Sequence, residues 1–300
     1  MSLIPHKKPV NYLNNKDILK EIHTSKNAYC AFLTPEDHRY DYIVDMPTET
    51  LEKSLEHALS LEAIQLAKET RATRLSIEAG EKDSVSPDSI PLTDLVFRIM
   101  TWDHVPVAPK APRKTDKKKT AKDIFEFDEE GEEIFADLED AAPGGAIVDD
   151  MVHVKVNFPP FQHFRFDATN TARCIGKSHW KGSLENGEFC KEHGQITNKL
   201  ARMYIMMCEK YAMKYNWRGY TYNDEMRNSA ILQLTYVGLR FNEAKSANPF
   251  AYYTAAITNS FCRVLNSEKR NQNIRDDILE INGLNPSWSR QGTSSTAYEE

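Results

Sequence analysis

Residues 106–150 limit most strongly what this chain can fold into. A basic block is followed there by an acidic block, and few of these residues can contribute to a hydrophobic core. Residues 106–122 carry seven Lys or Arg and three Pro, and residues 123–150 carry twelve Asp or Glu and no basic side chain. Opposed charge blocks with Pro and Gly are typical of a solvated linker. We therefore predict a charged, flexible linker over 106–150 between folded segments.

Two other interpretations of this linker stay open. The basic block could touch nucleic acid, or the acidic block could mimic nucleic acid and cover a basic surface. The acidic block also holds apolar side chains that are unusual in a tether, so part of it could fold on binding a partner. Those side chains are Ile124, Phe125, Phe127, Ile134, Phe135 and Leu138.

Composition limits the class of protein. The net charge of −6 argues against a protein that simply coats DNA, although the acidic block supplies more than this whole deficit. Five cysteines at irregular spacing, with no apolar signal segment at the N-terminus, favour a reducing, intracellular compartment. No apolar run approaches the roughly 18 residues needed to span a bilayer, so we expect no membrane partner.

The N-terminal region, 1–105, is predicted to be helical. A short helix is expected over 9–23, with Asn14 or Asn15 as its N-cap and Ile18, Leu19 and Ile22 on one face. A longer amphipathic helix is expected over 48–76, from the stripe Leu51, Leu55, Ala58, Leu59 and Leu66. The apolar segment 93–102 gives no clear indication of helix or strand.

Residues 151–193 are predicted to be a small β-rich segment. "MVHVKVNFPPFQHFRF" at 151–166 alternates apolar and polar residues on both sides of Pro159-Pro160, which predicts a hairpin or a small sheet.

The remaining pattern is helical, so the predicted fold class is mainly α. A helical domain is expected over 194–285, with three helices and then a short last helix ended by Gly283. A flexible tail is expected over 286–300. The third helix begins with Asn248 as N-cap and Pro249 at its first position. The predicted inward stripes are Ile196, Leu200, Met203, Met207 and Tyr211, then Met226, Ala230, Leu234, Val237 and Phe241, then Phe250, Tyr253 and Ile257.

Only one set of residues has metal-like spacing: Cys174, His179, Cys190 and His193. All four types bind zinc, but the spacing matches no standard finger and cysteine is often buried as a small hydrophobic residue. A metal-dependent enzyme is therefore one open alternative. No phosphate-binding, dinucleotide or nucleophile motif occurs, so we expect no catalytic activity and no cofactor.

The segments "NYLNNKDIL", "NWRGYTY", "FNEAKSANPFAYYTAAITNSF" and "EKRNQ" resemble, in this order, the late-transcription sigma factors of T-even-type bacteriophages. The resemblance covers roughly residues 9–25 and 195–282. It implies a helical module like region 2 of bacterial sigma factors, with a large insertion over about 35–190. The implied function is to bind host core RNA polymerase and direct it to late promoters, in the cytoplasm of the infected bacterium.

The resemblance also implies two sets of binding residues. The second helix would contact the clamp helices of the largest polymerase subunit through Glu225, Met226, Asn228, Ser229 and Leu232. The third helix would recognise and open a −10-like promoter element through Tyr252, Tyr253, Asn259, Arg263, Lys269 and Arg270. Flat side chains can stack on unpaired bases, and cations hold the phosphates.

One departure from primary sigma factors favours a rival. These place a Trp pair in the middle of the third helix, where this chain has Ala255 to Thr258 with no aromatic residue. A stacking role would then pass to Tyr252 or Trp217, with help from a co-activator or a phage sliding clamp. The alternative is a co-activator or anti-sigma type regulator that binds polymerase without reading promoters.

Overall fold

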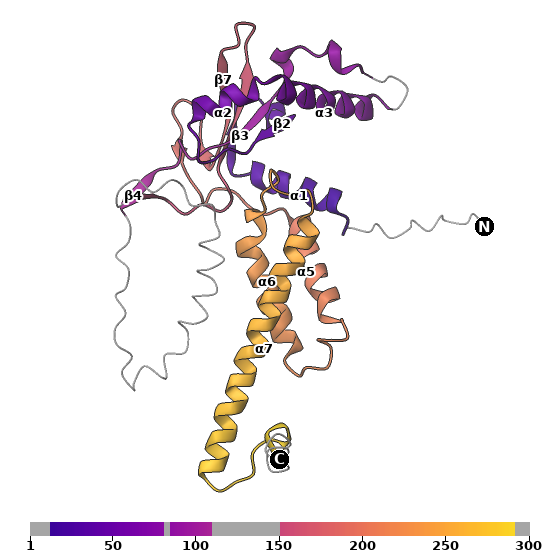
Figure 1. Ribbon diagram of the computed structural model, residues 1–300, viewed down its shortest axis with the longest axis vertical. Coiled ribbons are helices and arrows are strands. Elements are labelled where there is room, and N and C mark those ends of the chain that lie inside the picture. Colours follow the sequence, from indigo (N-terminus) through magenta and orange to yellow (C-terminus); the bar gives the residue numbers. More distant parts are fainter. Residues whose placement is uncertain (1–12, 81–84, 110–150, 292–300) are drawn as a thin grey trace, which may run out of the picture. The chain divides into compact units, whose positions relative to one another are not determined.

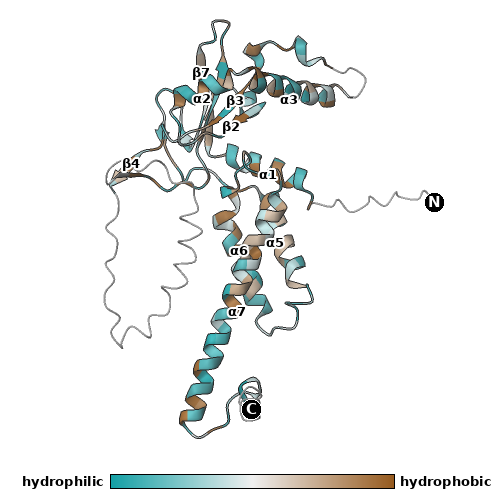
Figure 2. Cartoon of the chain, viewed as in Figure 1, coloured by the Kyte–Doolittle hydropathy of each residue, from teal (hydrophilic) through white to brown (hydrophobic). Residues whose placement is uncertain are grey.

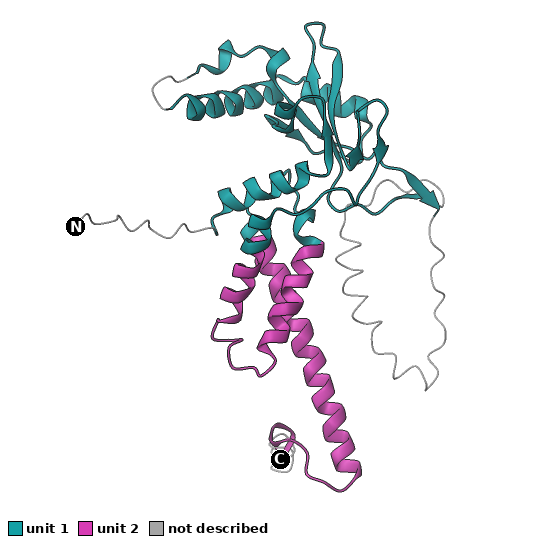
Figure 3. Ribbon diagram, turned by 180° about the vertical axis from the view of Figure 1, so that it is seen from behind, with its two compact units in different colours: residues 1–203, 237–250 teal, residues 204–236, 251–300 magenta. Residues whose placement is uncertain are grey.

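The computed structural model describes residues 13–80, 85–109 and 151–291. Two compact units follow from the contacts within the chain (Figure 3). Unit 1 is Met1–Met203 with Val237–Phe250, and unit 2 is Tyr204–Tyr236 with Ala251–Glu300. About half of the described residues are helical, which fits the mainly α prediction roughly, and the rest includes a sheet larger than the sequence pattern indicated.

Unit 1 is built on a five-stranded sheet with the order β1-β7-β6-β3-β2 (Figure 1). Only β2 and β3 run parallel; the other pairs are antiparallel. The strands are β1 Cys30–Phe32, β2 Tyr42–Val44, β3 Phe97–Met100, β6 Phe161–Phe166 and β7 Ala172–Ser178. Two small two-stranded sheets join β4 Val107–Pro109 to β5 Met151–His153, and β8 Trp180–Lys181 to β9 Glu188–Phe189.

This sheet differs from the predicted division of the chain. The N-terminal region 1–105 supplies three of the five strands: β1 and β3 pair with strands from 151–193, and β2 pairs with β3. A hairpin or a small sheet was predicted over 151–166. Both halves form strands in sheets, but they do not form a hairpin with each other, because β5 pairs with β4 while β6 pairs with β3 and β7. The strands are short and pair with distant segments, which a local pattern does not reveal. The start of the predicted linker forms β4, and residues 110–150 lie outside the described part.

Two helices cover one face of the sheet. They are α2, Leu51–Ala58, and α3, Leu61–Ala79, where one continuous helix was predicted. Ser60 ends that continuity, because its side chain accepts a hydrogen bond from the Ala63 amide and caps α3. Small residues let the helices approach the strands closely. The buried core between them comprises Val44, Ala58, Ala67, Ala72, Ile90, Leu95, Phe97, Ile99, Phe164 and Phe166.

Strand β3, which lies between β6 and β2, is buried on both faces, and this explains its unusual sequence. Phe97 and Ile99 face the apolar core, so the alternation of a strand turns Arg98 to the opposite face. Arg98 is only 1% exposed. Helix α1, Asn15–Asn27, begins at the predicted cap Asn14, whose side chain accepts bonds from two amides.

The remaining elements are mostly helical. They are α5 Asn198–Ala212, α6 Asn223–Val237 and α7 Pro249–Ile281, with short 3-10 turns η1 Pro35–His38, η2 Pro87–Ser89, η3 Leu92–Asp94 and η5 Gly238–Arg240. The predicted start at Pro249 is confirmed. The predicted separate last helix is wrong, because α7 continues without a break to Ile281. Gly283 ends it as predicted, with φ of +69° and with hydrogen bonds from Gly283 to Glu280 and from Leu284 to Leu279.

The predicted inward stripes can be compared with burial. Helix α6 and its extension match fully, since Met226, Ala230, Leu234, Val237 and Phe241 are all buried. In α7, Tyr253 and Ile257 are buried, but Phe250 is 41% exposed, because it lies in the first turn. None of the helices in the described ranges is long and apolar enough to cross a bilayer.

We predict that acid destabilises unit 1 selectively. All nine histidines precede residue 204. Burial lowers the pKa of His104 to about 4 and that of His179 to about 3, and burial together with Arg98 holds the pKa of His163 well below 6.5. Below about pH 6.5 the unfolded chain therefore binds more protons than the folded one, so stability falls as the pH drops toward 3–4. His104 and His179 each contribute about 3 kcal/mol to this loss, and His163 acts in the same direction.

Urea unfolding at pH 7 and pH 4.5 checks this expectation. Tryptophan emission would be followed in one variant that keeps only Trp102, in unit 1, and in another that keeps only Trp217, in unit 2. The midpoint reported by Trp102 should fall by much more than the one reported by Trp217. Equal losses at both positions would contradict a titration confined to the buried histidines.

Candidate functional site

Pairs of hydroxyl groups hold the helices of unit 2 together. Tyr204 and Tyr253 meet edge to face, with ring centroids 5.1 Å apart and their hydroxyls 3.1 Å apart. The Ser229 hydroxyl lies 3.0 Å from that of Ser260, which joins α6 to α7. Buried hydroxyls that bond to each other lose little on leaving water, so these contacts fix which helix faces point outward.

The outer face of α6 carries three of the five predicted polymerase-binding residues. Glu225, Asn228 and Leu232 are exposed and follow one another at helical spacing. Tyr236, four residues beyond Leu232, continues this face and is 60% exposed, while Leu232 is 56% exposed. Two large apolar side chains that stay in water on one helix face are typical of an interaction surface. We call Glu225, Asn228, Leu232 and Tyr236 the α6 surface.

The other two predicted polymerase contacts are placed differently. Met226 is completely buried, so its side chain belongs to the core and cannot reach a partner in this conformation. Ser229 is half-buried and bonded to Ser260. The sequence analysis missed Tyr236, although its i+4 spacing from Leu232 was visible in the sequence.

Four of the six predicted DNA-binding residues share one face of α7. Tyr252, Asn259, Arg263 and Arg270 are separated by 7, 4 and 7 residues, so they lie almost in line along the helix. Asn259 and Arg270 are exposed, whereas Tyr252 and Arg263 are half-buried. Burial lowers the pKa of Arg263, but a guanidinium stays protonated at neutral pH. We call these four residues the α7 surface.

Tyr253 and Lys269 do not belong to the α7 surface. Tyr253 is completely buried against Tyr204, so its predicted role in DNA binding is wrong for this conformation. The adjacent Tyr252 keeps part of its ring accessible. Lys269 is exposed but precedes Arg270 by one residue, which turns it about 100° around the helix. The visible part of α7 is mostly hydrophilic, as Figure 2 shows.

The segment after α7 folds back along that helix. Ser287 donates to Asp276, which is 1% exposed, and Arg290 pairs with Asp277 and Glu280. Residues 286–291, the first part of the predicted flexible tail, are therefore held by these contacts. Residues 292–300 lie outside the described part.

The predicted zinc ligands do not come together. In the described ranges, no three His, Cys, Asp or Glu side chains form a group that could hold a metal ion. Cys174 lies next to Gln162 and Gly176, and His179 is buried against the Phe158 ring with centroids 4.1 Å apart. The remaining pair is local, since His193 contacts the carbonyl of Cys190. All five cysteines are free thiols.

A buried group of charges under the sheet was missed by the sequence analysis. Lys26, 1% exposed, donates to the carbonyl of Phe241 at 2.7 Å and to the Glu243 carboxylate at 2.8 Å. Burial lowers the pKa of Lys26. Burial would raise the pKa of Glu243, but the charges of Lys26, His23 and Arg98 outweigh it and lower this pKa to about 2. We call Lys26, Glu243, His23 and Arg98 the buried charge cluster.

Arg98 is held in this cluster by aromatic rings. Its guanidinium carbon lies 3.9 Å from the centroids of both Tyr40 and Phe161. Its Nε donates to His163 Nε2 at 3.0 Å. Because arginine can only donate, His163 must be the neutral tautomer whose Nδ1–H donates to the Asp37 carbonyl at 2.7 Å. This chain of bonds explains how a cation can be buried in β3.

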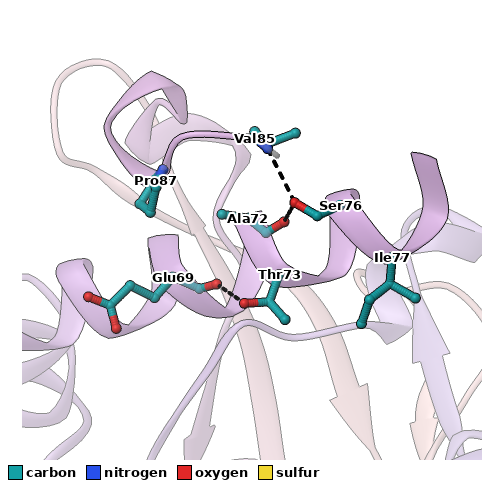
Figure 4. Close-up of a pocket in the computed structure, with 7 residues that line it drawn as sticks. All are labelled: Glu69, Ala72, Thr73, Ser76, Ile77, Val85 and Pro87. Carbon is teal, nitrogen blue, oxygen red and sulfur yellow. Dashed lines mark hydrogen bonds between the residues drawn. The ribbon is translucent and has the colours of Figure 1, made fainter. Parts of the chain in front are cut away.

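A shallow cavity of about 500 Å³ lies between α3 and η2 (Figure 4). Its hydroxyl groups are already bonded within the chain: Thr73 donates to the Glu69 carbonyl, and Ser76 donates to Ala72 and accepts from Val85. With its hydroxyls so occupied and one carboxylate, Glu69, on its rim, it offers no chemistry for a site.

No family model, curated protein or solved structure matches this chain.

We predict that truncating two adjacent tyrosines of α7 lowers the free energy of unfolding by very different amounts. Tyr253→Ala should lower the free energy of unfolding by about 3–5 kcal/mol, because it leaves a cavity and an unbonded Tyr204 hydroxyl. Tyr252→Ala should cost less than about 1 kcal/mol, since part of its ring is already in water. Urea titrations of both variants check this, with Tyr236→Ala as an exposed control. A large loss for Tyr252→Ala would remove Tyr252 from the α7 surface.

We also predict strong coupling within the buried charge cluster. Lys26→Met and Glu243→Gln should each cost about 3–5 kcal/mol, because each leaves the other group buried without its partner. The double variant should cost less than the sum of the two. The exposed pair Lys53 and Glu49 gives a matched control, where coupling should stay below about 1 kcal/mol. Additive losses at Lys26 and Glu243 would contradict the coupling.

Proposed function

We propose that this chain is a phage-encoded late sigma factor that binds host core RNA polymerase and directs it to promoters with a −10-like element. The observation that carries the proposal is spatial. The two segments of the sigma resemblance, residues 9–25 and 195–282, are far apart in sequence but meet in unit 1. The side chain of Asn15 accepts a bond from the amide of Phe250 in the first turn of α7. Ser25 and Glu21 bond to Thr197 just before α5.

The intervening segment behaves as an insertion, which supports the same proposal. The chain leaves α1 at Tyr29 and returns at Gly194 to the same ring. A Cβ at position 194 would come within 2.6 Å of Tyr29 ring atoms, and the His193 ring centroid lies 5.9 Å from that of Tyr29. An insertion whose ends lie together can be added to a helical module without separating the module's parts.

The α6 surface suits a contact with the polymerase clamp helices. Leu232 and Tyr236 would bury apolar area, and Glu225 offers a carboxylate to a basic partner. At a desolvated interface such a charge pair is worth several times its value in water. Met226 supports this face from within the core.

The α7 surface suits a contact with promoter DNA. Arg263 and Arg270 would hold phosphates, Asn259 could read a base edge, and the accessible part of Tyr252 could stack on an unpaired base. The phosphodiester chemistry would belong to the polymerase, so we propose no catalytic role and no cofactor for this chain. Such a factor would act in the cytoplasm of the infected bacterium.

One observation favours a second candidate function. Tyr253 is buried and residues 255–258 of α7 hold no aromatic side chain, so the chain offers little for strand opening on that helix. A regulator that binds polymerase but does not read promoters would need the α6 surface and not the α7 surface.

Run-off transcription on late-promoter templates with host core polymerase tests the proposal and separates the two candidates. We expect initiation at defined sites only when this chain is added. Binding to core polymerase without any directed initiation would support the regulator instead. No binding to core polymerase would overturn both.

Variants of the α6 surface and the α7 surface test whether these residues make the proposed contacts. Glu225→Lys together with Leu232→Asp should weaken co-purification with core polymerase by about tenfold or more, because both side chains are exposed at the proposed contact. Leu61→Asp is the control, since Leu61 is 88% exposed on α3. Arg270→Ala should leave co-purification intact and reduce initiation, with a shallower salt dependence. If Leu61→Asp weakens polymerase binding equally, the α6 surface is not the contact.

A further inference from the structure

The connection between α5 and α6 concentrates aromatic and basic side chains. Residues 211–222 read "YAMKYNWRGYTY" and contain five aromatic residues, a Lys and an Arg. No acidic residue occurs between Glu209 and Asp224. We call residues 211–222 the aromatic loop. Neither the α6 surface nor the α7 surface includes any of its residues.

This loop is fixed by its own hydrogen bonds. The Asn223 side chain donates to the carbonyls of Ala212 at 3.1 Å and Trp217 at 2.8 Å, so it ties both ends of the loop together. Backbone bonds run from Trp217 to Lys214 and from Tyr220 to Trp217. A surface that is ordered in advance loses less entropy on binding.

Aromatic contacts anchor the loop on α7. The Trp217 ring meets Phe261 edge to face at 5.3 Å, and Phe261 is completely buried. Tyr211 also packs on Phe261 at 5.1 Å, and its hydroxyl lies 2.7 Å from that of Thr258. The anchored rings therefore form a platform, while other rings of the loop stay in water.

The exposed rings are accompanied by cations. Tyr215 is 83% exposed, and the guanidinium carbon of Arg218 lies 5.4 Å from its ring centroid. Lys214 lies 4.1 Å from the centroid of Tyr211. Tyr220 and Tyr222 have ring centroids 5.2 Å apart, tilted by 38°. Flat faces next to positive charge are the two elements that bind an unpaired nucleic acid strand, because bases stack and phosphates pair.

We propose that the aromatic loop binds single-stranded nucleic acid, with bases stacking on Tyr215 and neighbouring rings and phosphates held by Lys214 and Arg218. A protein partner could also use exposed aromatic rings, but Lys214 and Arg218, in a stretch without an acidic residue between Glu209 and Asp224, favour a polyanion. The choice of DNA over RNA rests on the proposed function, since an opened promoter would supply the DNA strand.

Fluorescence anisotropy with labelled 12-nucleotide probes tests this on the full chain without polymerase. Single-stranded DNA, single-stranded RNA of the same sequence and the DNA duplex form the three arms. We expect the DNA single strand to bind at least tenfold more tightly than the duplex. Equal binding of RNA and DNA would keep the stacking site but remove its link to promoters. No single-strand binding at low salt would overturn the proposal.

Matched variants assign the binding to this loop. Tyr215→Ala should weaken single-strand binding by about tenfold, as expected for one lost stacking contact, and Tyr215→Phe should restore it. Lys214→Ala with Arg218→Ala should weaken binding and make the salt dependence shallower. Trp288→Ala is the control, because Trp288 is an exposed aromatic residue outside the α6 surface, the α7 surface and the aromatic loop. Circular dichroism would verify that each variant is folded.

Two outcomes would overturn the proposal through these variants. One is an equal loss for Trp288→Ala and Tyr215→Ala. The other is self-association that Tyr215→Ala abolishes without any oligonucleotide binding. Because polymerase is absent, this assay can fail while directed transcription succeeds, and the reverse is also possible.

Discussion

The ion pair between Lys26 and Glu243 is the contact on which unit 1 depends. It places two charges out of water, which is tolerable only because Nζ reaches the carboxylate at 2.8 Å and the Phe241 carbonyl at 2.7 Å. Lys26 ends α1, and Glu243 lies six residues before α7. The pair therefore fixes the N-terminal helix against the approach to the last helix, across more than two hundred residues of sequence.

The sheet adds a third element to this arrangement. Its strand β3 supplies apolar side chains to the α2 and α3 side and Arg98 to the opposite side, where Arg98 adds positive potential near Glu243. The sheet thus contributes one charge to the buried charge cluster, whose other members come from α1 and from the segment before α7. The neutral histidines needed for this arrangement make unit 1 sensitive to acid.

In unit 2, the residues that pack in the core and those of the proposed binding surfaces lie on different faces of the helices. Tyr253 and Met226 are buried, so the α6 and α7 surfaces consist of the residues that packing leaves outside. The aromatic loop adds rings that are held by Asn223 but remain accessible.

The sequence by itself determined the features that depend on neighbouring residues. Asn14 as a cap, Pro249 as the start of α7, Gly283 as its end and the buried stripe of α6 all follow from local hydrogen bonding and the helical period. Only the tertiary structure decided the five-stranded sheet, the burial of Tyr253 and the pairing of Lys26 with Glu243. These depend on which distant segments meet, and the free energy of burying a charge or a ring is set by its partners rather than by its own sequence neighbours.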